Sequence, residues 1–222
     1  MNQDISISSV VTASVCPLRY YLDQRDGRSP SSKYEVCKQV SYHTGDRLDG
    51  EEIWNELRAI SPDMDKSHRA YLDSCLQNCR RSGTFRDFSE TDLAVRSRRY
   101  GIFGVVDKIH DGEPAFSIIR AVSAPVAGVY SGDRLRVFGY MLCLQEMTGR
   151  EIASGCVEYI PDGICRTCIP QPIDKRRFFR ALDEARKIKK GEIPRKPVSP
   201  PCESCPDADR CNPKGKRLSD LF

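Results

Sequence analysis

The chain has 222 residues, of which 39% are hydrophobic and 30% are charged, and its net charge at pH 7 is +4. This length suits one domain with an appendage, and the composition is that of a globular protein rather than a disordered one. No apolar run approaches the ~20 residues that a membrane-spanning helix needs, and the first residues lack the pattern of a secretory signal. We therefore expect a cytoplasmic protein without a membrane partner.

Local patterns predict mainly helices in the first part of the chain. Cys16 precedes Pro17, and a proline at this position favours a helix that begins near residue 17. Residues 25–32 are rich in glycine, proline, serine and charge, which indicates a loop. Between residues 33 and 85 apolar side chains recur at helical intervals, so this region is expected to be mainly helical.

A sheet is expected in the middle of the chain. Short β-rich runs broken by glycine extend from residue 91 to 124 and indicate an antiparallel meander. Residues 133–147 are apolar over so wide an arc that they predict a largely buried helix. Strands at 155–160 and 165–169 are expected to flank a turn at 161–163. A helix over 174–190 and a proline-rich connector over 194–201 complete the pattern.

The 11 cysteines are the most informative feature of the composition. In a reducing compartment they favour thiolate ligands and buried thiols over disulfides. Cys202, Cys205 and Cys211 supply three closely spaced ligands, which indicates a metal centre. The alternative is three incidental surface thiols, which would be a chemical liability. Zinc and iron-sulfur clusters both accept four thiolates, so the spacing does not decide between them.

The fourth ligand must come from elsewhere in the chain. Cys165 and Cys168 are candidates, but residues three apart in a strand face opposite sides. Cys75 and Cys79 lie one helical turn apart, where core packing is the favoured interpretation. Buried thiols are also expected at Cys37, Cys143 and Cys156.

Three segments of the chain resemble the CRISPR-associated Cas-four family. They are Cys-Pro-Leu-Arg-Tyr-Tyr-Leu over 16–22, Ser-Arg-Arg-Tyr-Gly-Ile-Phe-Gly-Val-Val-Asp over 97–107, and the Cys202-x2-Cys205-x5-Cys211 run. The family consists of RecB-like nucleases with a cysteine lid. The resemblance implies an α/β (α+β) fold with a PD-(D/E)XK restriction-endonuclease-like core, a mixed central sheet flanked by helices. It also implies an N-terminal cysteine and helical region over 1–90, the nuclease-like core over 91–192 and the lid over 193–222.

The resemblance also implies a cofactor. Family members bind an iron-sulfur cluster, usually of the 4Fe-4S type, through one N-terminal and three C-terminal cysteines. In this chain those positions are Cys16, Cys202, Cys205 and Cys211. The resemblance therefore favours iron-sulfur over zinc.

The nuclease site implied by the resemblance is incomplete. Enzymes of this class hold Mg2+ or Mn2+ between an aspartate and a glutamate on adjacent strands, and a lysine assists the reaction. Asp107 matches the aspartate, but the glutamate and lysine positions hold Ile118 and Arg120. Isoleucine has no oxygen for a hard cation, and arginine is too basic to act as a base. Asp107 is thus the expected metal ligand. The alternative is that Asp107 is an ordinary solvated aspartate at the end of a strand.

Further positions depart from the family pattern. The metal-facing histidine of the family falls at Asp49, and its Gln-x3-Tyr motif becomes Arg136-x2-Gly139-Tyr140. Glu113 and Asp133 are alternatives for the lost glutamate. Together these departures indicate a nuclease site that has decayed.

The expected partner is nucleic acid. Residues 175–196 contain ten Lys or Arg against three acids, which fits either a phosphate-binding face or a solvated helix. We expect an iron-sulfur, nuclease-like protein that binds single-stranded or overhang-bearing DNA, and CRISPR adaptation proteins, during spacer acquisition. The alternatives are an active metal-dependent DNA exonuclease with a rearranged site, and a zinc-stapled interaction domain.

Overall fold

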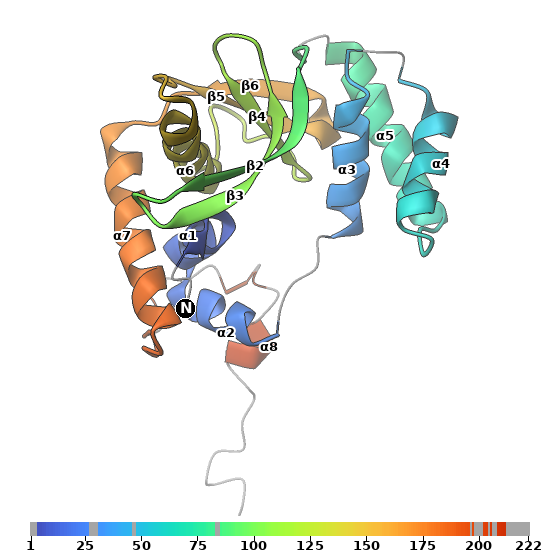
Figure 1. Ribbon diagram of the computed structural model, residues 1–222. Coiled ribbons are helices and arrows are strands. Elements are labelled where there is room, and N and C mark those ends of the chain that lie inside the picture. Colours follow the sequence, from blue (N-terminus) through green and yellow to red (C-terminus); the bar gives the residue numbers. More distant parts are fainter. Residues whose placement is uncertain are drawn as a thin grey trace, which may run out of the picture.

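The computed structural model describes residues 4–26, 31–45, 48–82, 85–195, 197, 202–203, 205 and 208–211. Within them the chain forms a mixed α/β fold, in which helices flank a six-stranded sheet (Figure 1). The strands are β1 (Ile5–Ser6), β2 (Glu90–Ser97), β3 (Ile102–Ile109), β4 (Phe116–Arg120), β5 (Gly155–Tyr159) and β6 (Ile164–Cys168). The helices are α1 (Ile7–Val15), α2 (Pro17–Asp26), α3 (Ser32–Tyr42), α4 (Gly50–Ile60), α5 (Lys66–Ser82), α6 (Ser131–Thr148), α7 (Pro172–Lys189) and α8 (Ala208–Cys211), with a short 3-10 turn, η1 (Ile160–Asp162).

The sheet has the strand order β1-β3-β4-β5-β6, and β2 pairs with the other edge of β3. β2 and β4 run antiparallel to β3, β6 runs antiparallel to β5, and β1 is parallel to β3. β5 is parallel to β4, and α6 forms the crossover between them, as a parallel connection requires. On the edge that faces β1 and β4, β3 pairs only at its two ends, at residues 102–103 and 108–109.

Two hydrophobic cores lie on opposite faces of the sheet. The larger core packs α1, α6 and α7 against the sheet, with Ile7, Val10 and Phe178 fully buried. The smaller core lies under α3, α4 and α5, which form the group of helices on the right of Figure 1. Ile118 belongs to the first core and Ile119 to the second, because successive residues of a strand point to opposite faces.

The structure confirms most of the predicted elements. A helix begins at Pro17, helices dominate residues 33–82, and β2, β3 and β4 form the antiparallel meander. The buried helix, the strand pair around residue 162 and the helix after residue 172 are also present. No helix in the described ranges is long and apolar enough to cross a membrane.

The sequence did not predict β1 or α1, which occupy residues 5–15. This stretch consists of Ile, Val, Thr, Ala and Ser, and most of these residue types have modest helix propensity. Two tertiary effects favour the helix. The Ser6 side chain caps it by accepting a hydrogen bond from the Ser9 N–H, and Ile7 and Val10 are completely buried against α6 and α7. Residues 5–15 therefore pack with the sheet region rather than with the helices α3–α5.

Candidate functional site

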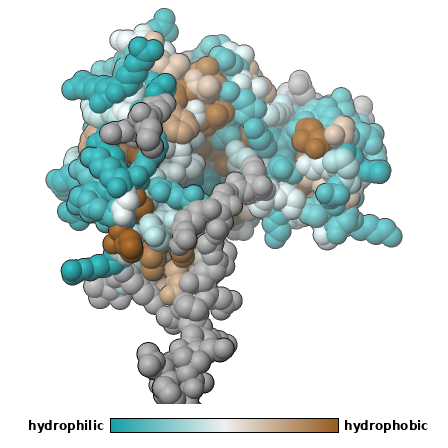
Figure 2. All heavy atoms as spheres, turned by 60° about the horizontal axis from the view of Figure 1, so that its bottom comes forward, coloured by the Kyte–Doolittle hydropathy of each residue, from teal (hydrophilic) through white to brown (hydrophobic). Residues whose placement is uncertain are grey.

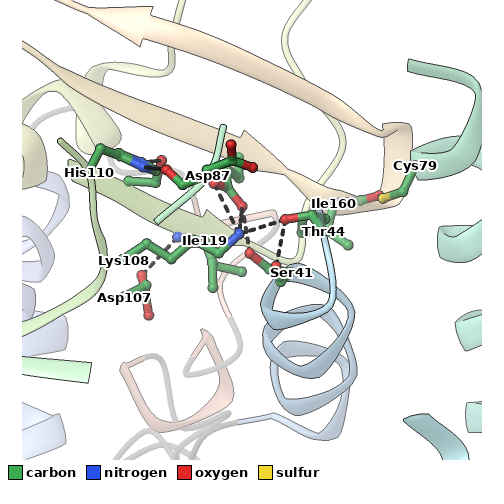
Figure 3. A network of polar contacts seen from close by, with 11 residues as sticks. Ser41, Thr44, Cys79, Asp87, Asp107, Lys108, His110, Ile119 and Ile160 are labelled. Carbon is green, nitrogen blue, oxygen red and sulfur yellow. Dashed lines mark hydrogen bonds and ion pairs between the residues drawn. The ribbon is translucent and has the colours of Figure 1, made fainter. Parts of the chain in front are cut away.

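Asp107 lies where β3 and β4 separate. The two strands pair only at Lys108 with Ser117 and at Ile109 with Phe116. Just beyond these pairs, the Ile119 N–H donates to Oδ2 of Asp107 at 2.8 Å instead of to a backbone carbonyl of β3 (Figure 3). We call the place where β3 and β4 separate the fork. The Asp107 carboxylate bridges the two strands there.

The Asp107 carboxylate is buried, with an exposed fraction of 7%. Burial raises its pKa, while the hydrogen bonds from the Ile119 N–H and the Tyr34 hydroxyl act in the opposite direction. Tyr34 donates to Oδ1 at 2.7 Å, so both carboxylate oxygens already have a donor. The positive charges of Lys38 and Arg136 also act against the effect of burial. A buried carboxylate with these partners is a functional-site candidate on physical grounds.

The two positions that the resemblance assigns to a catalytic glutamate and lysine hold Ile118 and Arg120 on β4. Ile118 is fully buried in the larger core. Arg120 contacts the start of α6, where its Nε lies 2.8 Å from Oδ1 of Asp133. Asp107 therefore has no second carboxylate on β4.

Asp133 holds two arginines at once. Arg136 Nη1 lies 3.1 Å from the same Oδ1 that Arg120 contacts. The Tyr159 hydroxyl donates to the other oxygen at 3.1 Å. Asp133 is buried, whereas both arginines remain partly exposed. Burial and the positive charge of Arg120 lower the pKa of Arg136, although an arginine still stays charged at neutral pH.

Tyr140, the tyrosine of the Arg136-x2-Gly139-Tyr140 run, lies against β3. A Cβ atom on Gly104 would stand 2.8 Å from Cε1 of Tyr140, so only glycine leaves room for this ring. Phe116 packs edge-on against the same ring, with centroids 6.2 Å apart. Burial raises the pKa of Tyr140 to about 12. Tyr140 is therefore a neutral, packed side chain beside the fork.

The charges around the fork do not fit a divalent cation. Asp107 and Asp133 contribute two negative charges, and Arg120 and Arg136 balance them with two positive ones. Mg2+ needs hard oxygen ligands in octahedral geometry, and here the Asp133 carboxylate is already bound by two guanidinium groups. The arrangement instead presents two partly exposed arginines, which are suited to bind phosphate.

Neither Asp49 nor Glu113 supplies a carboxylate to the fork. Asp49 is the N-cap of α4, and its Oδ1 accepts hydrogen bonds from the Glu51 and Glu52 N–H groups. Glu113 accepts hydrogen bonds from the Ala153 and Ser154 N–H groups at 3.0 Å. Both carboxylates therefore stabilise local backbone.

The four expected cluster cysteines are free thiols. Cys16 is buried between α1 and α2, where its N–H and carbonyl both take part in helical hydrogen bonds. Cys202 and Cys205 form one turn, in which the Cys205 N–H donates to the Cys202 carbonyl at 3.1 Å, and Cys211 ends α8. The donor set fits a thiolate-bound metal in its chemistry. No three His, Cys, Asp or Glu side chains within the described ranges converge on one ion.

The other cysteines follow the expectation for buried thiols. Cys37, Cys75, Cys79, Cys143 and Cys156 are all buried. Cys165 and Cys168 both lie in β6, where Cys168 is buried and Cys165 is partly exposed. Their spacing in the strand does not bring them onto one face.

Sequence reasoning missed a buried polar network next to Asp107 (Figure 3). Lys108 and Glu158 are both completely buried and form an ion pair. Thr44 accepts a hydrogen bond from Lys108 at 2.8 Å, and Ser41 donates to Glu158 at 2.5 Å. The available signal was a lysine next to Asp107 in β3 and a glutamate as the one charged residue of β5. This network attaches the end of α3 to the sheet beside the fork.

A scan against protein-family models gives no match, and neither does a search among curated proteins. The features that bear on function are therefore the fork at Asp107, the two arginines on Asp133 and the four cysteines.

Proposed function

We propose that this protein is a Cas-four-like, RecB-nuclease-like protein that binds DNA during CRISPR spacer acquisition and has lost DNA cleavage. The observation that carries the proposal is the fork at Asp107, where β4 supplies no second carboxylate. Two arginines are instead bound to Asp133, and the charge of one of them, Arg136, acts on Asp107. Single-stranded or overhang-bearing DNA is the proposed ligand, and adaptation proteins are the proposed partners.

The arrangement of strands supports a nuclease-like core of the PD-(D/E)XK type. In that class the catalytic acids lie on two adjacent strands, and Asp107 on β3 lies beside β4 where the two strands part. The positions for the acid and the lysine on β4 are Ile118 and Arg120. Ile118 and Arg120 are two residues apart, so both lie on the same face of β4, as the glutamate and lysine of a Glu-x-Lys motif must.

The loss of cleavage follows from the side chains at these positions. Hydrolysis of this kind needs a metal ion that activates water and stabilises the leaving oxygen. Ile118 offers no ligand, Asp133 is bound by two arginines, and both oxygens of Asp107 accept hydrogen bonds.

DNA binding follows from the two arginines. Arg120 and Arg136 are anchored on Asp133 through one carboxylate oxygen, and each guanidinium has more N–H donors than this contact uses. Arginine binds phosphate through a planar fork of donors, and anchoring on a buried carboxylate reduces the entropy lost on binding. The former cutting site thereby becomes a phosphate-binding site.

The four thiols support an iron-sulfur cluster as the cofactor. Cys16, Cys202, Cys205 and Cys211 would hold it, and the cluster would link the C-terminal segment to the junction of α1 and α2. The connector already approaches that junction, since Pro197 lines the same hollow as Val15 and Pro17. In this proposal the cluster has a structural role in keeping the lid in place.

A salt titration of DNA affinity tests the proposal. Arg120→Gln/Arg136→Gln should weaken binding, and each phosphate contact that is removed should lower the slope of log affinity against log salt by about one unit. The charge-retaining variant Arg120→Lys/Arg136→Lys should keep most of the slope. Arg58→Gln/Arg150→Gln removes the same charge from exposed positions on other parts of the chain and serves as the control.

Cleavage is measured on the same preparations. The wild type in Mg2+ or Mn2+ should degrade DNA no faster than Asp107→Ala does. Robust cleavage that Asp107→Ala abolishes would instead establish an active exonuclease. Absence of DNA binding at low salt would remove DNA as the ligand.

A further inference from the structure

A hollow of about 370 Å³ lies between the α1–α2 junction and α7, far along the chain from the fork residues. Residues 13–17 form one wall, α7 forms another, and Arg195 and Pro197 of the connector border it. Helices α1 and α7 pack side by side in the structure (Figure 1). We call this hollow the arginine groove, and its lining residues are Ala13, Ser14, Val15, Pro17, Arg177, Arg180, Ala181, Glu184, Arg195 and Pro197.

Three arginines line the groove, and none of them pairs with the single acid of the lining. Arg177, Arg180 and Arg195 are exposed and form no hydrogen bond or ion pair with any residue that the structure describes. Glu184 is the one acid in the lining, and its Oε2 lies 3.7 Å from Lys187 outside the groove. The groove therefore has an excess of positive charge that attracts an anion.

Neighbouring basic residues of the same region differ in this respect. Arg134 binds Asp174, whose pKa is lowered. Arg186 donates to the Tyr100 carbonyl at 2.7 Å, and Lys189 donates to the Asp4 carbonyl at 2.7 Å. These side chains hold the fold together through direct contacts. The charge of Arg177 also acts on Asp174, but without a hydrogen bond or ion-pair contact.

The floor of the groove is apolar and offers few hydrogen bonds. It consists of small or rigid side chains, namely Ala13, Val15, Pro17, Ala181 and Pro197. The single hydroxyl in the lining, on Ser14, donates to the Val11 carbonyl at 2.7 Å. A bound peptide would need partners for its backbone N–H and C=O groups, and this floor supplies none from its side chains. Sugars and bases can cover an apolar surface while their phosphates meet the arginines at the rim.

The size of the groove limits the ligand further. A volume of about 370 Å³ is that of a small-molecule pocket, which accommodates one strand of nucleic acid but no double helix. Arg177 and Arg180 lie three residues apart on α7, so their side chains are neighbours on one helix face.

Figure 2, which looks toward this end of the molecule, shows a mainly hydrophilic surface with small, separate hydrophobic areas.

We propose that the arginine groove binds a single strand of nucleic acid through successive phosphates. The inference rests on the proposed function, since it assigns a second contact for the strand that the fork binds. Arg195 comes from the connector that leads to Cys202, so the groove joins residues from both ends of the chain beside Cys16. A strand in the groove would thus run along the base of the cysteine lid.

Fluorescence anisotropy with a labelled single-stranded oligonucleotide, over a series of salt concentrations, tests the inference. Arg177→Gln/Arg180→Gln/Arg195→Gln should weaken binding at least ten-fold and lower the salt slope by about two units, at ~0.7 for each contact with a single strand. The matched control is Arg150→Gln/Arg176→Gln/Lys190→Gln, which removes three exposed charges that do not line the groove. Equal losses of affinity and slope in the two triple variants would overturn the inference.

A second pair of variants tests the same idea with the opposite sign. Glu184→Gln removes the single acid of the groove and should tighten binding several-fold. Asp183→Asn, the adjacent exposed acid outside the lining, should change affinity less. Equal tightening by both would show a general charge effect and contradict a specific groove.

The outcome also separates this inference from the proposed function. If the groove variant loses affinity while Arg120→Gln/Arg136→Gln binds as the wild type does, the groove stands and the fork does not bind DNA. If only the fork variant loses affinity, the groove inference fails and the proposed function stands. If poly-glutamate binding depends on the groove arginines but oligonucleotide binding does not, an acidic protein segment is the ligand and the inference is overturned.

Discussion

Nζ of Lys108 lies 3.2 Å from Oε2 of Glu158, and neither side chain is exposed to solvent. Burial lowers the pKa of Lys108, and the charge and hydrogen bonds of Glu158 act against this effect. The ring of Phe88 adds a cation-π contact at 4.7 Å. Because Lys108 directly follows Asp107, this buried pair fixes β3 at the point where the fork opens.

We expect the effects of replacing Lys108 and Glu158 on the free energy of unfolding to be strongly non-additive. Lys108→Met should lower the free energy of unfolding by about 3–5 kcal/mol, because it leaves the buried Glu158 carboxylate without its counter-charge. Lys108→Met/Glu158→Met should be more stable than the single variant, since no unpaired charge remains. Urea unfolding at neutral pH measures both values.

The exposed pair of Lys38 and Asp92 provides the control for this cycle. Its side chains are partly exposed, and Nζ lies 2.6 Å from Oδ1. Lys38→Met should cost no more than about 1 kcal/mol. A double variant at the buried pair that is no more stable than Lys108→Met alone would contradict the proposed coupling.

Asp107 should make the stability depend on pH in a defined direction. Its pKa is raised by burial, so the folded state binds this proton more tightly than the unfolded state does. The stability that the group contributes is present at low pH and is lost as the pH rises through the folded pKa. The Asp107→Asn variant has no titrating group at this position, so it does not lose this stability as the pH rises. The free energy of unfolding of the variant, relative to that of the wild type, should therefore increase between pH 4 and pH 8.

Asp65 is a control with the opposite sign. Hydrogen bonds from Ser67 and His68 lower its pKa, so its contribution is present above the unfolded pKa and lost in acid. Asp65→Asn should therefore lose stability relative to the wild type as the pH rises. Denaturant unfolding at several pH values compares the two variants, and a constant difference between Asp107→Asn and the wild type would refute the prediction for Asp107.

The cysteines make a prediction that absorption spectroscopy can check. In anaerobically purified protein, replacing any of Cys16, Cys202, Cys205 or Cys211 by Ala should remove the broad visible absorption of an iron-sulfur cluster. Cys165→Ala and Cys168→Ala should retain it, because β6 points these two side chains in different directions. A colourless protein that contains zinc, or a cluster that depends on Cys165 and not on Cys16, would rule out the assignment.

The sequence by itself determined the elements whose pattern is local. The helix α7 follows from its amphipathic period, α6 from an apolar stretch of helical length, and the antiparallel meander from β-rich runs broken by glycine, and the structure confirms all three. The sequence also shows an isoleucine and an arginine, Ile118 and Arg120, at the two positions that the resemblance assigns to a glutamate and a lysine. Such features can be read from the residue types and their spacing, so no contact between distant residues was needed.

Only the tertiary structure decided which distant side chains meet. The pairing of Arg120 and Arg136 on Asp133, and of Lys108 with Glu158, depends on how β4, α6 and β5 pack. The arginine groove likewise needs residues 13–15, Pro17, Arg195 and Pro197 to lie near α7. Helix α1 forms where local propensity is modest, because burial against α6 and α7 outweighs it. Such contacts join residues far apart in the chain, and a local pattern carries no information about them.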